Sequence, residues 1–157
     1  MGQGRIVHTA VTDSPNLFWL VQQFRNATPY DNVPKYIIHD NDPVFKSRNF
    51  KKLLDDSCVT AITTGKEAPW QNPYAERVIG SIRRELLDYV IPMNERHLEK
   101  MLQEYVSKYY NPHHTHQGLG GATPFPHPAY PPTKMADNTL VATPVLNGLY
   151  HTLEKAS

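Results

Sequence analysis

KYIIHDNDPVF, residues 35–45, joins a short apolar strand to a cluster of acidic residues. A strand is expected over residues 35–39, because tyrosine and isoleucine favour extended structure. Asp40 follows this strand directly, and Asp42-Pro43 continues into a turn. We therefore predict that Asp40 lies at the carboxyl end of a buried strand.

Strands and helices alternate on both sides of these residues. A β-branched run over residues 6–12 predicts a strand that feeds a helix, since Ser14-Pro15 supplies a cap and a first-turn proline. Residues 47–56 predict a second helix, and residues 59–64 predict another strand. The alternation indicates an α/β layer architecture. The side chains expected in its core are Leu17, Leu20, Val21, Phe24, Phe50, Leu53 and Leu54.

Two longer helices are expected after this region. Asn72-Pro73 is again a cap followed by a first-turn proline, and the predicted helix continues through Tyr89. Residues 94–109 predict the second helix, with apolar side chains at helical spacing. The inward stripe expected on the first helix consists of Ala75, Val78, Ile79, Ile82 and Leu86.

The character of the sequence changes after Asn111. Residues 113–134 are rich in Gly, Pro and His and predict an extended connector without a core of its own. Asn147-Gly148 lies between apolar residues and predicts a hairpin with a two-residue type I′ turn. Residues 113–157 are therefore expected to form a connector and a hairpin tail.

Composition limits the classes of protein that fit. The 157 residues suit one domain, and 39% hydrophobic with 20% charged residues is a globular composition. The net charge is only +1, so a nucleic-acid partner must be inferred from local patches. A single cysteine, Cys58, expected in the core, excludes an internal disulfide. No membrane-spanning or secretory pattern is visible, which predicts a soluble cytoplasmic protein.

Two carboxylates stand where catalytic chemistry is expected. Asp40 ends a strand, and Glu76, 35 residues further on, lies in the first turn of a helix. Carboxylates brought together from separate elements suit Mg²⁺ or Mn²⁺, which prefer oxygen ligands and leave positions open for phosphate and water. The alternative is that Asp40 caps a turn and Glu76 is an ordinary first-turn acid.

Three blocks of sequence resemble one known family. IIHDNDPVF at 37–45, APWQNPYAERVIGSIRREL at 68–86 and YYNPHHTHQGL at 109–119 resemble, in order, the integrase core of retroviral integrases and insertion-sequence transposases. This resemblance implies an α/β, ribonuclease H-like fold. It also implies that Asp40 and Glu76 are catalytic metal ligands for Mg²⁺ or Mn²⁺.

The resemblance also identifies candidate DNA contacts. Arg83 and Arg84 match the basic pair that follows the catalytic Glu, and Gln71 and Asn72 precede the helix. At 100° per residue, Gly80 lies between Glu76 and Arg83 on one face, where it is expected to leave space for a DNA backbone. Two alternatives remain: Asn72 only caps the helix, and Arg84 belongs to a solvated charged face.

The family uses a third carboxylate, an Asp on the first strand, so that two metal ions are held. Residues 6–12 resemble the family's third strand, which implies that the first strands and their Asp are absent from this chain. Asp13, Asp31 and Asp42 are poor substitutes, because metal ligation also requires correct geometry. Little strand-transfer activity is therefore expected from the chain alone.

The leading hypothesis is a partial integrase core, residues 1–112, derived from a mobile element and related to DNA integration by cleavage and strand transfer. Its expected partners are DNA, further copies of the chain and a separate N-terminal DNA-binding segment or protein. One alternative is a catalytically inert DNA-binding or protein-interaction remnant. Another is a small nuclease acting on RNA–DNA hybrids.

Overall fold

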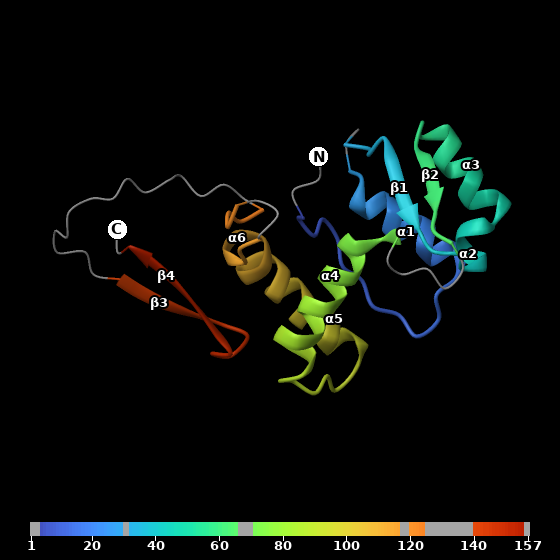
Figure 1. Cartoon of the computed structure of the whole chain (residues 1–157). Helices are drawn as coiled ribbons and strands as arrows, with labels where there is room; N and C mark the ends of the chain where they lie inside the picture. Colours follow the sequence, from blue (N-terminus) through green and yellow to red (C-terminus); the bar gives the residue numbers. More distant parts are fainter. Residues whose placement is uncertain (1–3, 30–31, 66–70, 117–119, 125–139, 156–157) are drawn as a thin grey trace. The chain divides into compact units, whose positions relative to one another are not determined.

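The computed structural model describes residues 4–29, 32–65, 71–116, 120–124 and 140–155 (Figure 1). The chain divides into two compact units, which are described separately. Unit 2 is the continuous segment Thr12–Ile91, and unit 1 combines Met1–Val11 with Pro92–Ser157. Among the described residues, no helix has the length and apolar character needed to cross a membrane.

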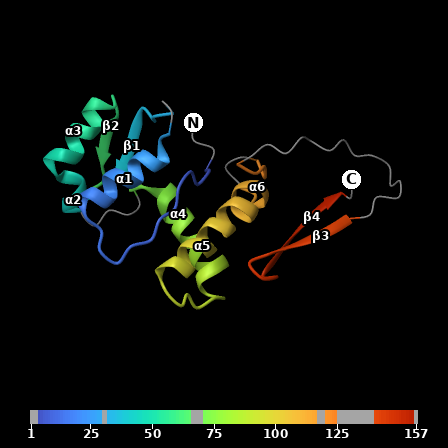
Figure 2. The same ribbon diagram turned by 180° about the vertical axis from the view of Figure 1, so that it is seen from behind.

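The core of unit 2 lies between three helices and one face of a small sheet. Helices α1 (Leu17–Ala27), α2 (Pro43–Lys46) and α3 (Arg48–Asp56) surround it. Helix α1 covers one face of the strands, behind them in Figure 1 and in front of them in Figure 2. The packing confirms the core expected from the helical spacing. Its members are Phe24, Phe50, Leu54 and Val59, with Leu17, Leu20, Val21, Ile37, Phe45 and Leu53 packed against them.

The sheet of unit 2 pairs β1 (Tyr36–His39) with β2 (Thr60–Thr63) in parallel. Helices α2 and α3 form the crossover between the two strands, as a parallel pair requires. The α/β alternation is thus confirmed, and both strands end at the same edge of the sheet. On the face away from α1, Tyr36, Ile38 and Ile62 are exposed.

The candidate catalytic helix starts as the sequence predicts and ends differently. In α4 (Pro73–Ile82), the Asn72 side chain accepts a hydrogen bond from the Ala75 amide. A π-helical turn, η2 (Arg83–Leu87), then ends the helix two residues before the predicted position. Leu86 is buried as expected, but the inward orientation predicted for Ile79 is wrong, because this side chain is 61% exposed.

The strand predicted over residues 6–12 is wrong, since the structure shows no strand there. The backbone amide and carbonyl of Ile6 instead form hydrogen bonds with a side chain. Asn111 accepts from the Ile6 amide at 3.0 Å and donates to the Ile6 carbonyl at 2.9 Å. The following helix is also capped later than predicted, by Asn16, whose side chain accepts from the Trp19 amide.

Unit 1 is built on a long helical segment. Asn94 caps α5 (Glu95–Tyr105), which continues as the π-turn η3 (Val106–Tyr110) and the short α6 (Asn111–His113). Tyr105 and Tyr110 are fully buried on this segment, with their ring centroids 5.8 Å apart. The helix predicted from residue 94 is confirmed.

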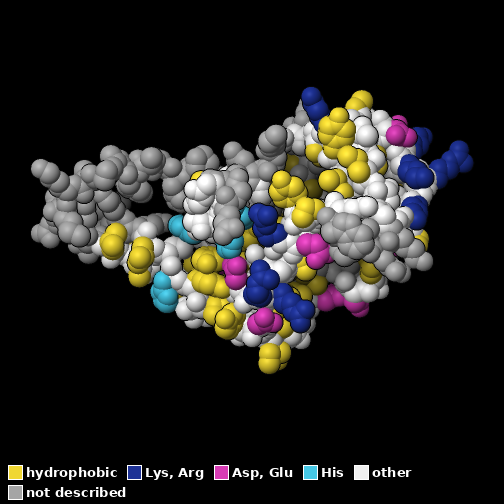
Figure 3. Space-filling model, viewed as in Figure 1, with side chains coloured by type: hydrophobic (Ala, Val, Ile, Leu, Met, Phe, Trp, Pro, Cys, Tyr) yellow, Lys and Arg dark blue, Asp and Glu magenta, His cyan; other side chains and the backbone are white. Residues whose placement is uncertain are grey.

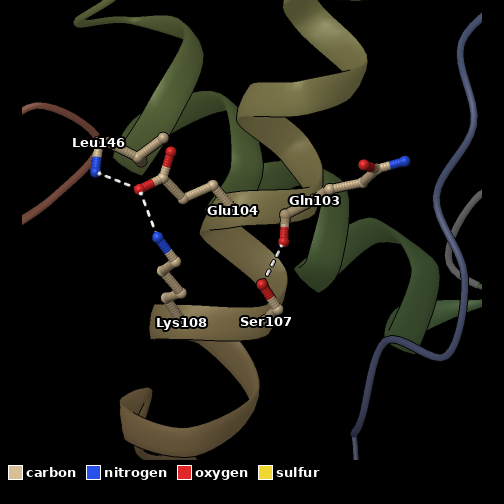
Figure 4. A network of polar contacts seen from close by, with 5 residues as sticks. All are labelled: Gln103, Glu104, Ser107, Lys108 and Leu146. Carbon is tan, nitrogen blue, oxygen red and sulfur yellow. Dashed lines mark hydrogen bonds and ion pairs between the residues drawn. The ribbon is translucent and has the colours of Figure 1, made fainter.

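A C-terminal hairpin packs against these aromatic rings. Strand β3 (Leu140–Val145) pairs antiparallel with β4 (Tyr150–Lys155). Tyr150 stacks on Tyr109 with centroids 4.0 Å apart. At the turn, Glu104 accepts from the Leu146 amide and from the Lys108 ammonium, each at 3.2 Å (Figure 4). The hairpin is therefore attached to η3 by ring stacking and to α5 by a carboxylate.

The predicted hairpin is confirmed, but its two-residue connection is wrong. The last paired residues are Val145 and Tyr150, so four residues connect the strands. Leu146 has a positive φ of 54°, as have Asn147 at 54° and Gly148 at 93°. The left-handed conformation of Leu146 ends the ladder one residue early, while its amide bonds Glu104 instead.

Candidate metal and nucleic-acid site

A cleft of about 670 Å³ lies in unit 2 where the sheet ends. Asp40, which follows β1, and Glu76, in the first turn of α4, both line this cleft. Its apolar wall includes Ile38 and Ile79, which explains why Ile79 is not buried in the core. The two carboxylates singled out in the sequence are therefore brought to one concave surface.

Asp40 is held in place by the loop that follows β1. Its Oδ1 accepts a hydrogen bond from the Asp42 amide at 3.1 Å. The neighbouring Asn41 donates from its side-chain amide to the Thr64 carbonyl at 2.9 Å. Thr64 follows β2, so Asn41 ties the ends of the two strands together beside Asp40. This contact restricts the backbone that carries the carboxylate.

His39 supports the same loop from the other side of the strand. The side chain is only 7% exposed, and its ring stacks on Phe45 with centroids 4.9 Å apart. Its Nδ1 lies 2.7 Å from the backbone oxygen of Asp40, not from the carboxylate. His39 therefore packs against the loop through its ring and bonds the backbone of Asp40.

Glu76 is oriented by the start of α4. Asn72 caps the helix through its carbonyl oxygen, and Pro73 occupies the first turn. The Gln71 side chain accepts a hydrogen bond from the Gly65 amide at 2.6 Å. This bond links the residue before the cap of α4 to the backbone just after β2. Gln71 and Asn72, the two DNA contacts predicted before the helix, thus both form hydrogen bonds within the chain. Asn72 also lines the cleft.

The predicted basic pair lies on the π-turn at the end of α4. Arg83 and Arg84 are both exposed. The space expected at Gly80 is already used, because a Cβ there would come within 2.9 Å of the Arg84 Nη1. The guanidinium of Arg84 thus lies back against the glycine. The expectation that Gly80 leaves an open approach for a DNA backbone is wrong in this conformation.

Among the described residues, no three His, Cys, Asp or Glu side chains form a group that could hold a metal ion. Asp42 lines the cleft, but its carboxylate caps α2 by accepting from the Val44 amide at 2.8 Å. Asp31 and Trp70 lie outside the residues that the structure describes. Asp40 and Glu76 therefore present an oxygen donor pair in the described part of the cleft.

Two other residues differ from what the sequence indicated. Cys58 is exposed and has a positive φ of 56°, so its predicted core position is wrong. Asn111 was singled out only as part of the YYN block, yet it is 94% buried and bonds Ile6. No local pattern could have revealed that bond, because 105 positions separate the two residues.

A solved structure identifies the class of fold. A chain of the simian T-cell lymphotropic virus intasome, determined by cryo-EM in complex with the PP2A regulatory subunit B56 gamma, matches with a TM-score of 0.52 and 18% identity. The match covers 92% of this chain and 56% of the intasome chain, so this chain spans just over half its length. The chain thus shares an α/β fold with that intasome chain.

The sequence itself also matches a family model. Residues 57–124 match the family model described as integrase core domain. The resemblance to integrases is confirmed there. The matched segment contains Glu76, Arg83 and Arg84, whereas Asp40 precedes it. No curated protein matches the chain.

Proposed function

We propose that the cleft of unit 2 binds Mg²⁺ or Mn²⁺ through Asp40 and Glu76 and takes part in DNA cleavage and strand transfer. The observation that carries this proposal is the position of both carboxylates in one cleft at the carboxyl edge of a parallel sheet. Ligands of α/β sheets bind in this location. The integrase core match over residues 57–124 supports DNA as the substrate.

The donor set suits such an ion. Mg²⁺ is commonly bound by one or two carboxylates, with water and substrate phosphates in its remaining positions. Asp40 and Glu76 are exposed, so an ion between them remains accessible to a phosphodiester. When bound, the ion would stabilise negative charge on the phosphate oxygens. The chain itself orients the carboxylates through Asn41 and through the cap at Asn72.

We further propose that the chain tested by itself transfers strands weakly. A two-metal reaction needs more ligands than a pair of carboxylates supplies. The part of the cleft that the structure describes brings no third acidic, histidine or cysteine ligand to them. A further carboxylate from another segment or protein would complete the site, and copies of the chain would pair two DNA ends.

Mn²⁺ titration monitored by calorimetry tests the metal site directly. Asp40→Asn and Glu76→Gln should each weaken binding at least about tenfold, as loss of a ligand or its support does. Asp56→Asn and Glu99→Gln are matched controls on exposed or half-exposed positions outside the cleft, and should bind like the parent chain. Equal Mn²⁺ affinity in all five proteins would refute the proposed site.

Joining of labelled duplex ends tests the activity. The chain is assayed with Mg²⁺ or Mn²⁺, with and without an added segment carrying a strand that ends in Asp. Weak joining that increases with the added segment supports incomplete ligation. Robust joining without the segment, abolished by Glu76→Gln, contradicts it.

A catalytically inert DNA-binding module is the second candidate. The observation that favours it is the lack of a third ligand among the described residues, together with exposed cations on η2. Such a module would bind duplex DNA equally well with and without Mn²⁺. It would also show no loss of DNA affinity on Glu76→Gln.

A further inference from the structure

Four basic residues lie within seven positions of the sequence at the α2–α3 junction. They are Lys46, Arg48, Lys51 and Lys52, here called the α3 basic face. All four side chains are exposed. In the described part of the chain, none of them forms an ion pair or a side-chain hydrogen bond. Figure 3 shows Lys and Arg side chains over this part of unit 2, at its right edge.

Helical spacing places three of these cations together. Arg48, Lys51 and Lys52 are related by three and four positions, so they share one side of α3. Phe50 and Leu54, buried in the core, occupy the other side of the helix. The basic face is therefore directed to solvent by the same packing that anchors α3.

The charge distribution does not serve the helix itself. A helix favours acidic residues in its first turn and basic residues in its last turn. Helix α3 has no acid in its first turn and no base in its last, where Asp55 and Asp56 lie. The charges thus oppose the helix dipole at both ends. The helix dipole therefore does not account for the cations at the start of α3.

A second hollow lies beside this face. Its volume is about 660 Å³, and Lys46 and Lys51 line it together with the hydroxyl-bearing Thr60 and Thr63 of β2. Asp55 is the acidic group on its wall. Two ammonium groups and two hydroxyls are the side chains that commonly contact phosphate oxygens.

We propose that the α3 basic face binds the phosphate backbone of duplex DNA, through side chains that do not line the cleft of Asp40 and Glu76. Arg48 to Lys52 covers about 6 Å along the helix axis, a length over which duplex DNA carries three to four phosphates. The net charge of the chain is only +1, so this binding depends on local charge density. The choice of DNA as partner rests on the proposed function; the binding itself needs no metal and no catalysis.

The test measures fluorescence anisotropy of a labelled 20-base-pair duplex between 50 and 200 mM salt, without divalent metal. The variant is K46Q/R48Q/K51Q/K52Q. A matched control, R25Q/K35Q/R96Q/K100Q, removes the same number of charges from exposed positions elsewhere. Two double variants, K46Q/R48Q and K51Q/K52Q, keep the test informative if the quadruple variant folds poorly, which circular dichroism reports. All are made in the full chain.

We expect the quadruple variant to bind 10- to 1,000-fold more weakly at about 0.1 M salt, with the slope of log K against log salt reduced by about two to four. The control should lose less than about threefold, and each double variant should lose part of the affinity. An equal loss in the basic-face variant and the control overturns the proposal. Binding of polyglutamate in preference to the duplex also overturns it, in favour of an acidic protein partner.

The K46Q/R48Q/K51Q/K52Q variant distinguishes the two proposals. It should lose duplex affinity and still bind Mn²⁺ like the parent chain, because none of its four side chains lines the cleft of Asp40 and Glu76. If the parent chain binds the duplex normally but has no Mn²⁺ affinity, the metal site alone is refuted. Intact Mn²⁺ affinity with no effect of the basic-face substitutions would refute the DNA surface alone.

Discussion

Replacing Asn111 by Ala should destabilise unit 1 through the loss of two specific hydrogen bonds. The side chain is 6% exposed and bonds both the amide and the carbonyl of Ile6, at 3.0 and 2.9 Å. Each such bond contributes about 1 kcal/mol net, and more when the partner is left buried without another. We therefore expect Asn111→Ala to lower the free energy of unfolding by about 2–3 kcal/mol.

Urea denaturation and amide exchange measure this effect together. The urea concentration at the midpoint of unfolding should fall. The Ile6 amide should exchange much faster than in the parent chain, because its hydrogen-bond acceptor is gone. Asn26→Ala is a matched control, since Asn26 accepts one exposed bond from Gln22 and should cost less than about 0.5 kcal/mol. Equal losses in the two variants, with unchanged exchange at Ile6, would refute the reasoning.

Three further substitutions test other contacts. Asn72→Ala should lower the free energy of unfolding by about 1 kcal/mol in thermal denaturation, because the helix cap is lost. Asn72→Ser should lower it by only a few tenths, because serine also caps a helix. Reduced end joining by Asn72→Ser would indicate that Asn72 contacts DNA as well. Gly80→Ala should raise the stability by about 0.5–1 kcal/mol because the flexible Arg84 end can move away, and a lower melting temperature would contradict this. Tyr150→Ala should cost about 2–3 kcal/mol and expose the hairpin to limited proteolysis; unchanged cleavage would show that its stacking on Tyr109 does not hold the hairpin.

Local chemistry explains which parts of the fold could be predicted. Caps such as Asn72 and Asn94 bond amides three residues away, so a short sequence pattern contains both partners. The amphipathic pattern of α3 likewise contains the residues that reach the core. No strand forms over residues 6–12, and Ile6 within this stretch bonds Asn111, which lies in a remote part of the sequence.

In the candidate site too, features set by neighbouring residues could be predicted and a feature set by irregular backbone could not. Asp40 could be placed at a strand end, and Glu76 in a first helical turn, from neighbouring residues alone. Their common cleft depends on β1 and β2 pairing in parallel, which the α/β alternation implies. The position of Arg84 against Gly80 could not be foreseen, because a uniform 100° per residue does not hold in the π-turn that begins at Arg83.

The discontinuity of unit 1 has a consequence for the order of events during synthesis. Residues 12–91 form one continuous unit, and they are synthesised before Asn111 exists to bond Ile6. At about 5–20 residues per second, the 105 positions between Ile6 and Asn111 correspond to a delay of roughly 5–20 s. Unit 2 can thus complete its core cotranslationally, whereas the amino-terminal segment waits for the carboxyl-terminal half of the chain.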